Sequence, residues 1–392
     1  MPGKNKTMKQ YDVIIIGAGA AGLSATGELV TRGKRVLVLD MGNTPARKVA
    51  VSGGGKCNIT NIATDVTRYF GENPNFVRGA LSRVGPTDIL QWCDRHKIKL
   101  YEKEPGRYFC ADGAGVVVDA LIHDAMGADI KYNHAVESVT RRDDQFIVAA
   151  NGTKFCANSV IVATGGTSFG TLGVSDVGYK IAKSFGHKIV PVRPALCAMA
   201  TEMFGTDFAG ISIPVEITVA RAKIQDDMLF THFGIGGPAV YRASVRDLSN
   251  GITINLCPDV DMFATLKNAK QKNGKRNISS ILSEYLPVRI AKYFSNNDVR
   301  NIADWRDSEI RAIADRVNKT QIQSSDIKLY NTQSAEIVRG GVSTEHISSK
   351  TMESKLCPGL FFAGEVLDIS GDLGGFNLHW AWASGRIAGR NA

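Results

Sequence analysis

The stretch that decides the fold is YDVIIIGAGAAG, Tyr11–Gly22. Its apolar segment, Asp12–Ile16, predicts a short buried strand, and Gly17, Gly19 and Gly22 follow with the spacing GxGxxG. In a dinucleotide-binding turn the first glycine makes the tight turn and the second lets a pyrophosphate approach the backbone. The third lets helix and strand pack closely. The spacing therefore predicts a strand–turn–helix unit that binds a dinucleotide.

The residues that follow this stretch support the prediction. Ala20–Thr31 reads as a helix, whose first N–H groups and positive dipole end favour phosphates. A second strand, Arg35–Leu39, ends in Asp40, whose carboxylate can accept hydrogen bonds from a ribose. A lone GxGxxG is a weak signal, but here the flanking strands, the helix and the acidic residue are all present. The motif does not by itself separate FAD from NAD.

The composition is that of a globular protein. The chain has 392 residues, 44% hydrophobic and 22% charged, which is enough for two or three domains with hydrophobic cores. No apolar run approaches the roughly 20 residues that a membrane-spanning helix needs, and the start MPGKNKTMKQ lacks the apolar core of a signal peptide. The seven cysteines are scattered without a CxxC pair, which favours reduced thiols in the cytoplasm over disulfides or zinc.

The charge is positive and unevenly distributed. The formal net charge is +9, and residues 264–319 contain twelve Lys or Arg against six Asp or Glu. One interpretation is that the charge serves solubility alone, and another is a polyanionic partner such as RNA. Lys267, Lys270, Lys272, Lys275 and Arg276 form the densest cluster, although such clusters are also common on solvated helix faces.

The pattern of expected secondary structure changes along the chain. Strands alternate with helices up to about residue 192, Asn151-Gly152 predicts a hairpin turn, and Val160–Thr164 predicts a buried strand. The fold class we predict is α/β: a two-dinucleotide-fold-like (Rossmann) domain built from both chain ends, residues 8–192 and 338–392. Into it we expect two insertions, a β-rich domain over 193–262 and a basic helical domain over 263–337.

Three more glycine-rich segments point to a flavin nucleotide. SGGGKCNITN, Ser52–Asn61, has three consecutive glycines that can expose N–H groups as an anion nest, and Arg47, Lys48 and Lys56 flank it. VIVATGG is a strand that ends in glycines, as is frequent in two-dinucleotide-fold flavoproteins. The segment 360–385, LFFAGEVLDISGDLGGFNLHWAWASG, has the order strand, Gly-Glu, glycine loop and helix, which recurs near the C-terminus of FAD proteins. The dipole of that helix favours negative charge on a reduced flavin.

Together these segments resemble the BaiN/RdsA family of bacterial flavoproteins. The resemblance covers Tyr11–Gly385 and rests on the motifs GAGAAG, SGGGKCN, LFTHFGIGGPA, AEIVRGGV, TMESK and FFAGEVLD. The chain departs from the family pattern in having Ala46 for Gly, Lys56 for Arg and His379 for Gln. The last change places a titratable group at a helix start near the expected flavin. The segment 108–112, YFCAD, is most similar to the branch that includes the 23S ribosomal RNA dihydrouridine synthase.

The resemblance implies a three-domain FAD protein that NADH or NADPH reduces transiently, with no metal. It implies hydride transfer to C6 of a uracil and protonation of C5, which makes 23S ribosomal RNA a partner through the basic helical insertion. The expected FAD-binding residues are Gly17, Gly19, Ala20, Ala21, Gly22, Asp40, Met41, Arg47, Lys48, Ser52, Gly53, Gly54, Gly55, Cys57, Asn58, Ala135, Val136, Ala163, Thr164, Gly165, Gly166, Gly364, Glu365, Gly374, Gly375, Phe376 and Asn377.

Two residues are candidates for catalysis. Cys110 is a candidate acid, since a thiol near its ordinary pKa of about 8.5 is protonated at neutral pH; the alternative is a buried apolar filler. His232 either orients substrate over the flavin or forms a hydrogen bond at a domain junction. Trp380 and Trp382 lie on different helix faces, so at least one is expected in the core.

Two other functions remain open at this point. One is a small-molecule flavin oxidoreductase, such as an enone reductase or an amine oxidase, which predicts turnover without RNA. The other is a non-enzymatic flavoprotein, which predicts bound FAD that NADH and NADPH reduce very slowly.

Overall fold

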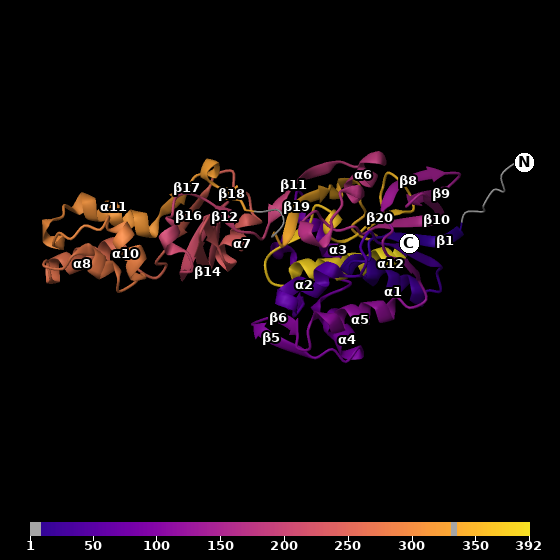
Figure 1. Ribbon diagram of the computed structural model, residues 1–392, viewed down its shortest axis with the longest axis horizontal. Helices are drawn as coiled ribbons and strands as arrows, with labels where there is room; N and C mark the ends of the chain where they lie inside the picture. The colour runs from indigo at the N-terminus through magenta and orange to yellow at the C-terminus, as the bar shows by residue number, and fades with distance from the viewer. Residues whose placement is uncertain (1–8, 331–334) are drawn as a thin grey trace, which may run out of the picture. The chain divides into compact units, whose positions relative to one another are not determined.

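The computed structural model describes residues 9–330 and 335–392, and the chain divides into two compact units (Figure 1). Unit 1 comprises residues 1–193 and 332–392, and unit 2 comprises residues 194–331. The two ends of the chain thus build one unit, as the sequence predicts. No helix among the described residues is long and apolar enough to cross a membrane.

A parallel sheet forms the centre of unit 1. Its strands lie in the order β7-β2-β1-β10, with β20 added beside β10. The strands span β1 (Lys9–Ile16), β2 (Val36–Leu39), β7 (Asp129–Lys131), β10 (Thr153–Val162) and β20 (Leu360–Phe362). All residues of β2 and β20 are buried and apolar, as are the last residues of β1 and β10, which is typical of a parallel sheet covered on both faces. The predicted strand over Asp12–Ile16 is confirmed within β1.

The first half of β10 belongs to an antiparallel meander. It pairs with β9 (Gln145–Ala150), which pairs in turn with β8 (Val136–Arg142). Asn151 and Gly152 connect β9 to β10 with φ of +46° and +69°, the left-handed conformation that a tight hairpin turn requires and that Asn and Gly tolerate best. The predicted hairpin is confirmed.

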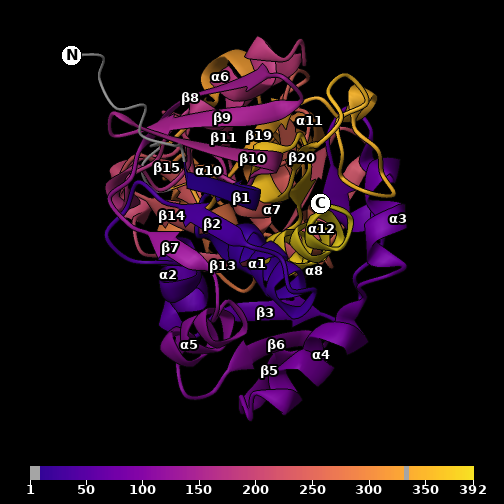
Figure 2. The same cartoon turned by 90° about the vertical axis from the view of Figure 1, so that its right-hand side faces the viewer.

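Two helices from opposite ends of the chain lie against each other in unit 1. They are α1 (Ala20–Thr31) and α12 (Phe376–Asn391), and Figure 2 shows them side by side. A Cβ atom on Gly385 would lie 2.3 Å from the carbonyl oxygen of Ala21, and one on Gly389 would lie 2.4 Å from that of Ala25. These two glycines therefore permit a close helix–helix approach that larger residues would prevent.

Smaller elements complete unit 1. A three-stranded sheet has the order β3-β6-β5, and two short pairs join β11 with β19 and β21 with β4. The bounds are α2 (Arg47–Gly55), β3 (Asn58–Asn61), β4 (Tyr69–Phe70), α3 (Arg78–Leu81), α4 (Pro86–Arg95), β5 (Leu100–Glu104), β6 (Arg107–Cys110), α5 (Ala114–Asp124), α6 (Val177–Ser184), β11 (Ile189–Ala195), β19 (Ile337–Val342) and β21 (Ser370–Gly371).

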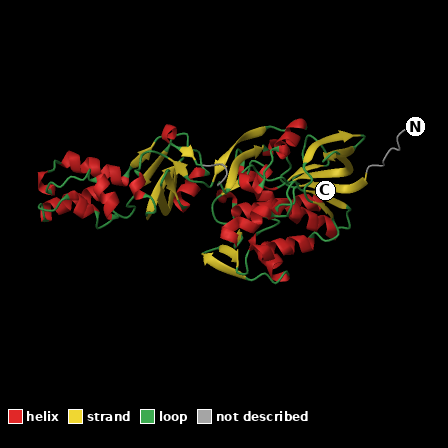
Figure 3. Cartoon of the chain, viewed as in Figure 1, coloured by secondary structure: helices red, strands yellow, loops and turns green. Residues whose placement is uncertain are grey.

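Unit 2 combines a sheet with a group of helices (Figure 3). The two share a continuous hydrophobic cluster. The strand order is β17-β16-β13-β14-β15-β12-β18. The strands are β12 (Met199–Ala200), β13 (Ser212–Val219), β14 (Ala222–Thr231), β15 (Gly234–Gly236), β16 (Ile252–Asn255), β17 (Thr320–Ile322) and β18 (Lys328–Leu329). The helices are α7 (Pro238–Ser244), α8 (Met262–Lys272), α9 (Ile278–Leu282), α10 (Val288–Phe294) and α11 (Asp307–Asn318). The predicted β-rich and helical segments therefore lie in one unit and share a core.

Candidate dinucleotide site

Four parallel strands of unit 1 end in register. The cross-strand partners at their carboxyl ends are Leu39, Ile16, Val162 and Phe362. The residues that follow them, Asp40, Gly17, Ala163 and Ala363, consequently lie along one edge of the sheet. Ligands of doubly wound α/β sheets bind outside this carboxyl edge. The glycine-rich segments that the sequence singled out meet there.

The turn after β1 has the geometry that its glycines predict. Gly17 has φ of +106°, and a Cβ atom there would lie 2.4 Å from the carbonyl oxygen of Ala163. A Cβ on Gly22 would lie 1.9 Å from the carbonyl oxygen of Gly17, whereas a Cβ on Gly19 would meet nothing within 4 Å. Gly19 also precedes α1 without a side-chain cap. The turn is therefore packed at two glycines and open in front of the helix N-terminus, where an anion can approach.

Asp40 holds the edge of the sheet together. Its Oδ2 accepts a 2.7 Å hydrogen bond from the Ala18 N–H, and its Oδ1 accepts one of 2.7 Å from the Gly42 N–H. The Arg47 guanidinium lies 3.1 Å from Oδ1. An ionised carboxylate has about four acceptor positions, so these contacts leave it about one for a ribose hydroxyl. The segment with Met41 is joined to the residues before Ala135 and Val136 by backbone hydrogen bonds.

The glycine segment after Ser52 is a nest of left-handed residues. Gly53, Gly54 and Gly55 have φ of +58°, +66° and +82°, which interrupts α2 after its first turns. Cβ atoms on Gly54 and Gly55 would meet nothing within 4 Å. Successive N–H groups in such a conformation form a concave anion-binding surface. The open space beside the two glycines is where a phosphate or flavin group can lie.

The basic residues before the nest are tied to distant segments. Arg47 donates to the backbone oxygen of Leu172. Lys48 lies 2.6 Å from Glu365 and 2.8 Å from the Ser168 hydroxyl, and Glu365 accepts a 2.9 Å hydrogen bond from the Val338 N–H. Lys48 and Glu365, both expected at the cofactor, therefore neutralise each other. Ser168 was missed by the sequence interpretation, because a single serine carries no local signal.

The start of α12 faces the glycine nest segment. Gly374 and Gly375 have φ of +125° and +96°, and no side chain caps the helix. A Cβ on Gly375 would lie 2.7 Å from the Asn58 Oδ1, which is buried without a hydrogen-bond partner. A buried amide oxygen without a partner is rare in a complete site. It fits a cofactor that donates a hydrogen bond there. The Asn377 amide bonds the backbone of Gly371 instead.

These observations fit a dinucleotide cofactor. The site offers an open helix N-terminus, a glycine nest and a hydrogen-bond acceptor without a partner. All three lie in the segments that the sharp glycine turns bring together at the strand ends. Thr164, Gly165 and Gly166 follow β10 at the same edge, and a Cβ on Gly166 would lie 2.4 Å from the Val338 side chain. Gly364 likewise leaves no room, since its Cβ would lie 2.9 Å from that of Ala21.

The structure places the two catalytic candidates in different units. Cys110 ends β6 in unit 1, its side chain is fully buried, and its N–H donates to the Lys56 carbonyl at 2.9 Å. The thiol of the neighbouring Cys57 is also buried, which raises its pKa to about 12. His232 lies in the exposed turn between β14 and β15 of unit 2. Neither unit by itself contains both residues.

The expectation of a titratable histidine beside the flavin requires correction. His379 is fully buried, its Nδ1 lies 2.8 Å from the Thr60 hydroxyl, and its Nε2 lies 3.1 Å from the Val84 carbonyl. A neutral ring that accepts at Nδ1 and donates at Nε2 satisfies both contacts. Burial lowers the pKa of His379 to about 4. It therefore contributes the same acceptor and donor as a glutamine amide.

The two tryptophans of α12 are both core residues. The Trp380 indole donates a hydrogen bond of 3.2 Å to the Gly364 carbonyl, and the Trp382 indole donates one of 2.9 Å to the Ile59 carbonyl. Each side chain is 2% exposed. The prediction that at least one is core is confirmed. Because both are buried and hydrogen-bonded, neither is placed to stack on a base.

The basic cluster of unit 2 is partly neutralised. Lys267 and Lys270 both pair with Asp307, and Arg276 pairs with Glu284. Lys272 and Lys275 are exposed and have no carboxylate within ion-pair distance among the described residues. The cluster that the sequence indicates therefore reduces to two unpaired lysines.

Comparison with known proteins gives a family for the chain. A model of the family described as "HI0933-like protein Rossmann domain" matches residues 11–391. The chain is 38% identical over 392 residues to a protein named ribosomal RNA dihydrouridine synthase from Haemophilus influenzae, covering 96% of this chain and 97% of that protein. It is 34% identical over 388 residues to one of the same name from Escherichia coli, covering 96% of each. It is 29% identical over 411 residues to the 3-dehydro-bile acid delta(4,6)-reductase of Clostridium scindens, covering 96% of this chain and 98% of that protein.

Proposed function

Because the chain belongs to the HI0933-like protein Rossmann domain family, we propose that it is an FAD-dependent reductase of ribosomal RNA. It reduces a uridine of 23S ribosomal RNA to dihydrouridine, with NADH or NADPH as the electron donor. The observation that carries the proposal is the 34–38% identity, over 96% of the chain, to relatives named ribosomal RNA dihydrouridine synthase. Action on ribosomal RNA implies a cytoplasmic location, in agreement with the seven free thiols.

The chain's own residues bind and orient the cofactor. The N–H groups at the start of α1 and those of Gly53, Gly54 and Gly55 would bind the negatively charged groups of FAD, and Asp40 a ribose hydroxyl. Asn58 would accept a hydrogen bond through its unpartnered Oδ1. When bound, FAD supplies hydride transfer between the nicotinamide and the substrate. The start of α12 favours negative charge that develops beside it.

The proposed reaction is the reduction of a carbon–carbon double bond conjugated to a carbonyl. NAD(P)H, a proton and uridine give NAD(P)⁺ and dihydrouridine, with the hydride at C6 and the proton at C5. The 3-dehydro-bile acid reductase among the relatives is named for a reduction of the same class, so a small-molecule enone reductase is the second candidate function. An amine oxidase lacks a comparable relative among these three.

Cys110 is the proposed proton donor, and because it is buried this role requires that the substrate gain access to its thiol. A fully buried thiol touches a uracil only if the substrate or a local movement reaches it. We expect Cys110→Ala to retain FAD and its reduction by NAD(P)H but to lose RNA reduction at least about 100-fold, as removal of a general acid does. Cys93→Ala, at another buried thiol, is the matched control. Equal activity of both variants would assign Cys110 to packing.

The test of the proposed function is mass spectrometry of 23S ribosomal RNA from cells with and without the gene. We expect one dihydrouridine to disappear on deletion and to return on complementation. In parallel, purified protein should oxidise NAD(P)H faster with unmodified 23S RNA than with a cyclic enone such as 2-cyclohexenone. Unchanged RNA together with rapid enone turnover would favour the second candidate.

A further inference from the structure

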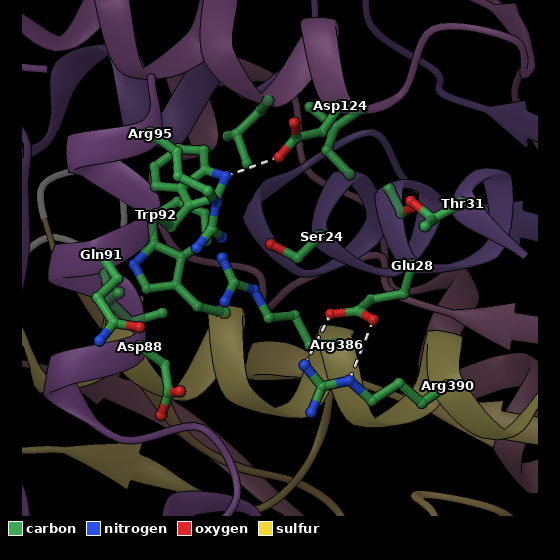
Figure 4. A pocket seen from close by; sticks show the side chains of 15 residues that line it. Ser24, Glu28, Thr31, Asp88, Gln91, Trp92, Arg95, Asp124, Arg386 and Arg390 are labelled. Carbon is green, nitrogen blue, oxygen red and sulfur yellow. Dashed lines mark hydrogen bonds and ion pairs between the residues drawn. The ribbon is translucent and has the colours of Figure 1, made fainter. Parts of the chain in front are cut away.

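A polar cavity of about 420 Å³ lies in unit 1. It is lined by the middle and end of α1, by α4 and α5, and by the last turns of α12 (Figure 4). The candidate dinucleotide site uses the first turns of α1 and α12, so the cavity is built from other parts of the same helices. No sequence pattern predicts this cavity, because its residues come from four separate helices. We call it the arginine pocket, after Arg95, Arg386 and Arg390 in its wall.

The carboxylates of the arginine pocket are already occupied. Glu28 forms a two-pronged ion pair with Arg390, at 3.0 and 2.9 Å. Asp124 accepts a 2.6 Å hydrogen bond from the indole of Trp92 and lies 2.9 Å from the ring of His96. The third acid, Asp88, accepts from the Gly85 N–H at the start of α4. Figure 4 shows the contacts of Glu28 with Arg390 and of Asp124 with Trp92 as dashed lines.

Two guanidinium groups are left over. Among the described residues, neither Arg386 nor Arg95 has a carboxylate within ion-pair distance, and no hydrogen bond joins their side chains to the protein. Arg386 is partly buried and lies between Trp92 and Glu28 in Figure 4, with its guanidinium carbon 6.0 Å from the Trp92 ring. Burial lowers the pKa of Arg386, the nearby Glu28 and Asp124 carboxylates raise it, and the charges of Arg390 and Arg95 lower it further. Arginine nevertheless remains charged at neutral pH.

Neutral polar groups complete the wall. The Ser24 hydroxyl and the Gln91 amide line the cavity, and no hydrogen bond of their side chains is found among the described residues. The formal charges of the lining cancel, with three arginines against three carboxylates. A lining with no net charge does not attract a polyanion, so the attraction for an anion here is local to the two arginines that no carboxylate pairs. The volume falls in the range of small-molecule sites and exceeds that of a single oxyanion.

We propose that the arginine pocket binds a phosphate group, carried by a nucleotide or free as inorganic phosphate. A guanidinium fork matches the oxygens of a phosphate in charge and spacing. Arg386 and Arg95 are the two forks of this cavity that have no carboxylate partner among the described residues. Ser24 and Gln91 can donate to the remaining phosphate oxygens. The proposal concerns binding alone, and it stands whether or not the chain reduces RNA.

The experiment is isothermal titration calorimetry of the FAD-loaded protein at low ionic strength. The probes are sodium phosphate, uridine 5′-monophosphate and uridine, and the variants are Arg386→Gln and Arg95→Gln. Arg142→Gln is the matched control, since its side chain is 79% exposed on β8, outside the pocket. The flavin spectrum and thermal unfolding check that each variant is folded, and exposed Arg95 provides a test if Arg386→Gln fails to fold.

We expect phosphate and uridine 5′-monophosphate to bind the parent, and uridine not to bind. Arg386→Gln should weaken binding at least tenfold, Arg95→Gln several-fold, and Arg142→Gln not at all. Equal affinity for the two phosphates would identify inorganic phosphate as a sufficient ligand, whereas tighter binding of the monophosphate would identify a nucleotide. The proposal is overturned if neither phosphate binds, if uridine binds as tightly as its monophosphate, or if folded Arg386→Gln and Arg95→Gln bind like the parent.

Discussion

The dinucleotide edge of unit 1 and the basic helices of unit 2 differ in how much of each is visible in the sequence. At the edge, the glycine spacing of residues 17–22 and 53–55 determines backbone shape, and the positive φ values and close approaches occur where it predicts them. In unit 2, Lys267 belongs to the basic cluster that the sequence indicates, but it pairs with Asp307, 40 residues further along the chain. Backbone conformation is encoded locally, whereas charge pairing depends on the fold.

The largest expected effect concerns the dinucleotide edge of unit 1, where the local sequence determines the backbone conformation. Gly22→Ala places a Cβ 1.9 Å from the backbone oxygen of Gly17, so the turn must open. We expect a loss of about 3 kcal/mol or more in the free energy of unfolding and purification without FAD. The measurements are thermal unfolding and the ratio of flavin to protein absorbance.

Gly19→Ala is the matched control for this substitution. A Cβ there meets nothing within 4 Å, and φ is −83°. We therefore expect the FAD-free protein to melt close to the parent, while FAD affinity falls because the methyl group faces the ligand space. If Gly22→Ala instead keeps both its FAD and its melting temperature, the close packing of the turn does not determine the site.

The second prediction tests a contact that local sequence does not show. His379 reaches Thr60 and Val84, which lie 319 and 295 residues away, and burial lowers its pKa from 6.5 to about 4. Above pH 6.5 the ring is neutral in both states and this contribution to stability is complete. As the pH falls from 6.5 towards 4, the unfolded chain takes up a proton that the folded chain does not. Stability then falls by roughly 3 kcal/mol.

His379→Gln should remove that pH dependence. The amide can make the same two hydrogen bonds without titrating, so we expect similar stability at pH 7 and about 3 kcal/mol more than the parent at pH 4. Urea unfolding at both pH values measures the difference. Buried His187 also has its pKa lowered to about 4, but it is present in both proteins and cancels. Identical slopes for the two proteins would contradict the burial of His379.

The fold was predictable where a local sequence pattern determines an element, and where the two chain ends show the same alternation of strands and helices. The strand at Asp12–Ile16, the hairpin at Asn151-Gly152 and the union of the two chain ends are all confirmed. The contact network was not predictable, because Ser168, Glu365 and Lys48 come together only through the sheet. The arginine pocket was invisible for the same reason, since no local spacing unites residues of α1, α4, α5 and α12.

The third prediction separates binding from folding within the dinucleotide site. The side-chain oxygen of Asn58 is buried without a hydrogen-bond partner. The nearby Asn61 side chain donates a hydrogen bond of 3.0 Å to the Gly374 carbonyl and accepts one of 2.9 Å from the Ala63 N–H. Asn58→Ala should weaken FAD binding by about 1–2 kcal/mol, a factor of about 5–30, with little loss in FAD-free stability. Asn61→Ala should lower the FAD-free stability by about 1–3 kcal/mol. Flavin titration and thermal unfolding test both, and equal behaviour of the two variants would contradict the distinction.

The smallest effect returns to the basic helices and applies if unit 2 contacts RNA. Lys272 and Lys275 are unpaired among the described residues and exposed, so each can release about one counterion from a phosphate on binding. Lys267 is already paired with Asp307. Replacing Lys272 or Lys275 with Gln should reduce the slope of log affinity against log salt by up to about 1. Lys267→Gln should leave the slope nearly unchanged and cost at most about 1 kcal/mol of stability. Filter binding of 23S RNA across a salt series measures the slopes. If Lys267→Gln changes the slope as much as the other two substitutions, the ion pair between Lys267 and Asp307 opens when RNA binds. The number of basic residues in the sequence would then predict the RNA-binding surface better than the ion pairs of the folded chain do.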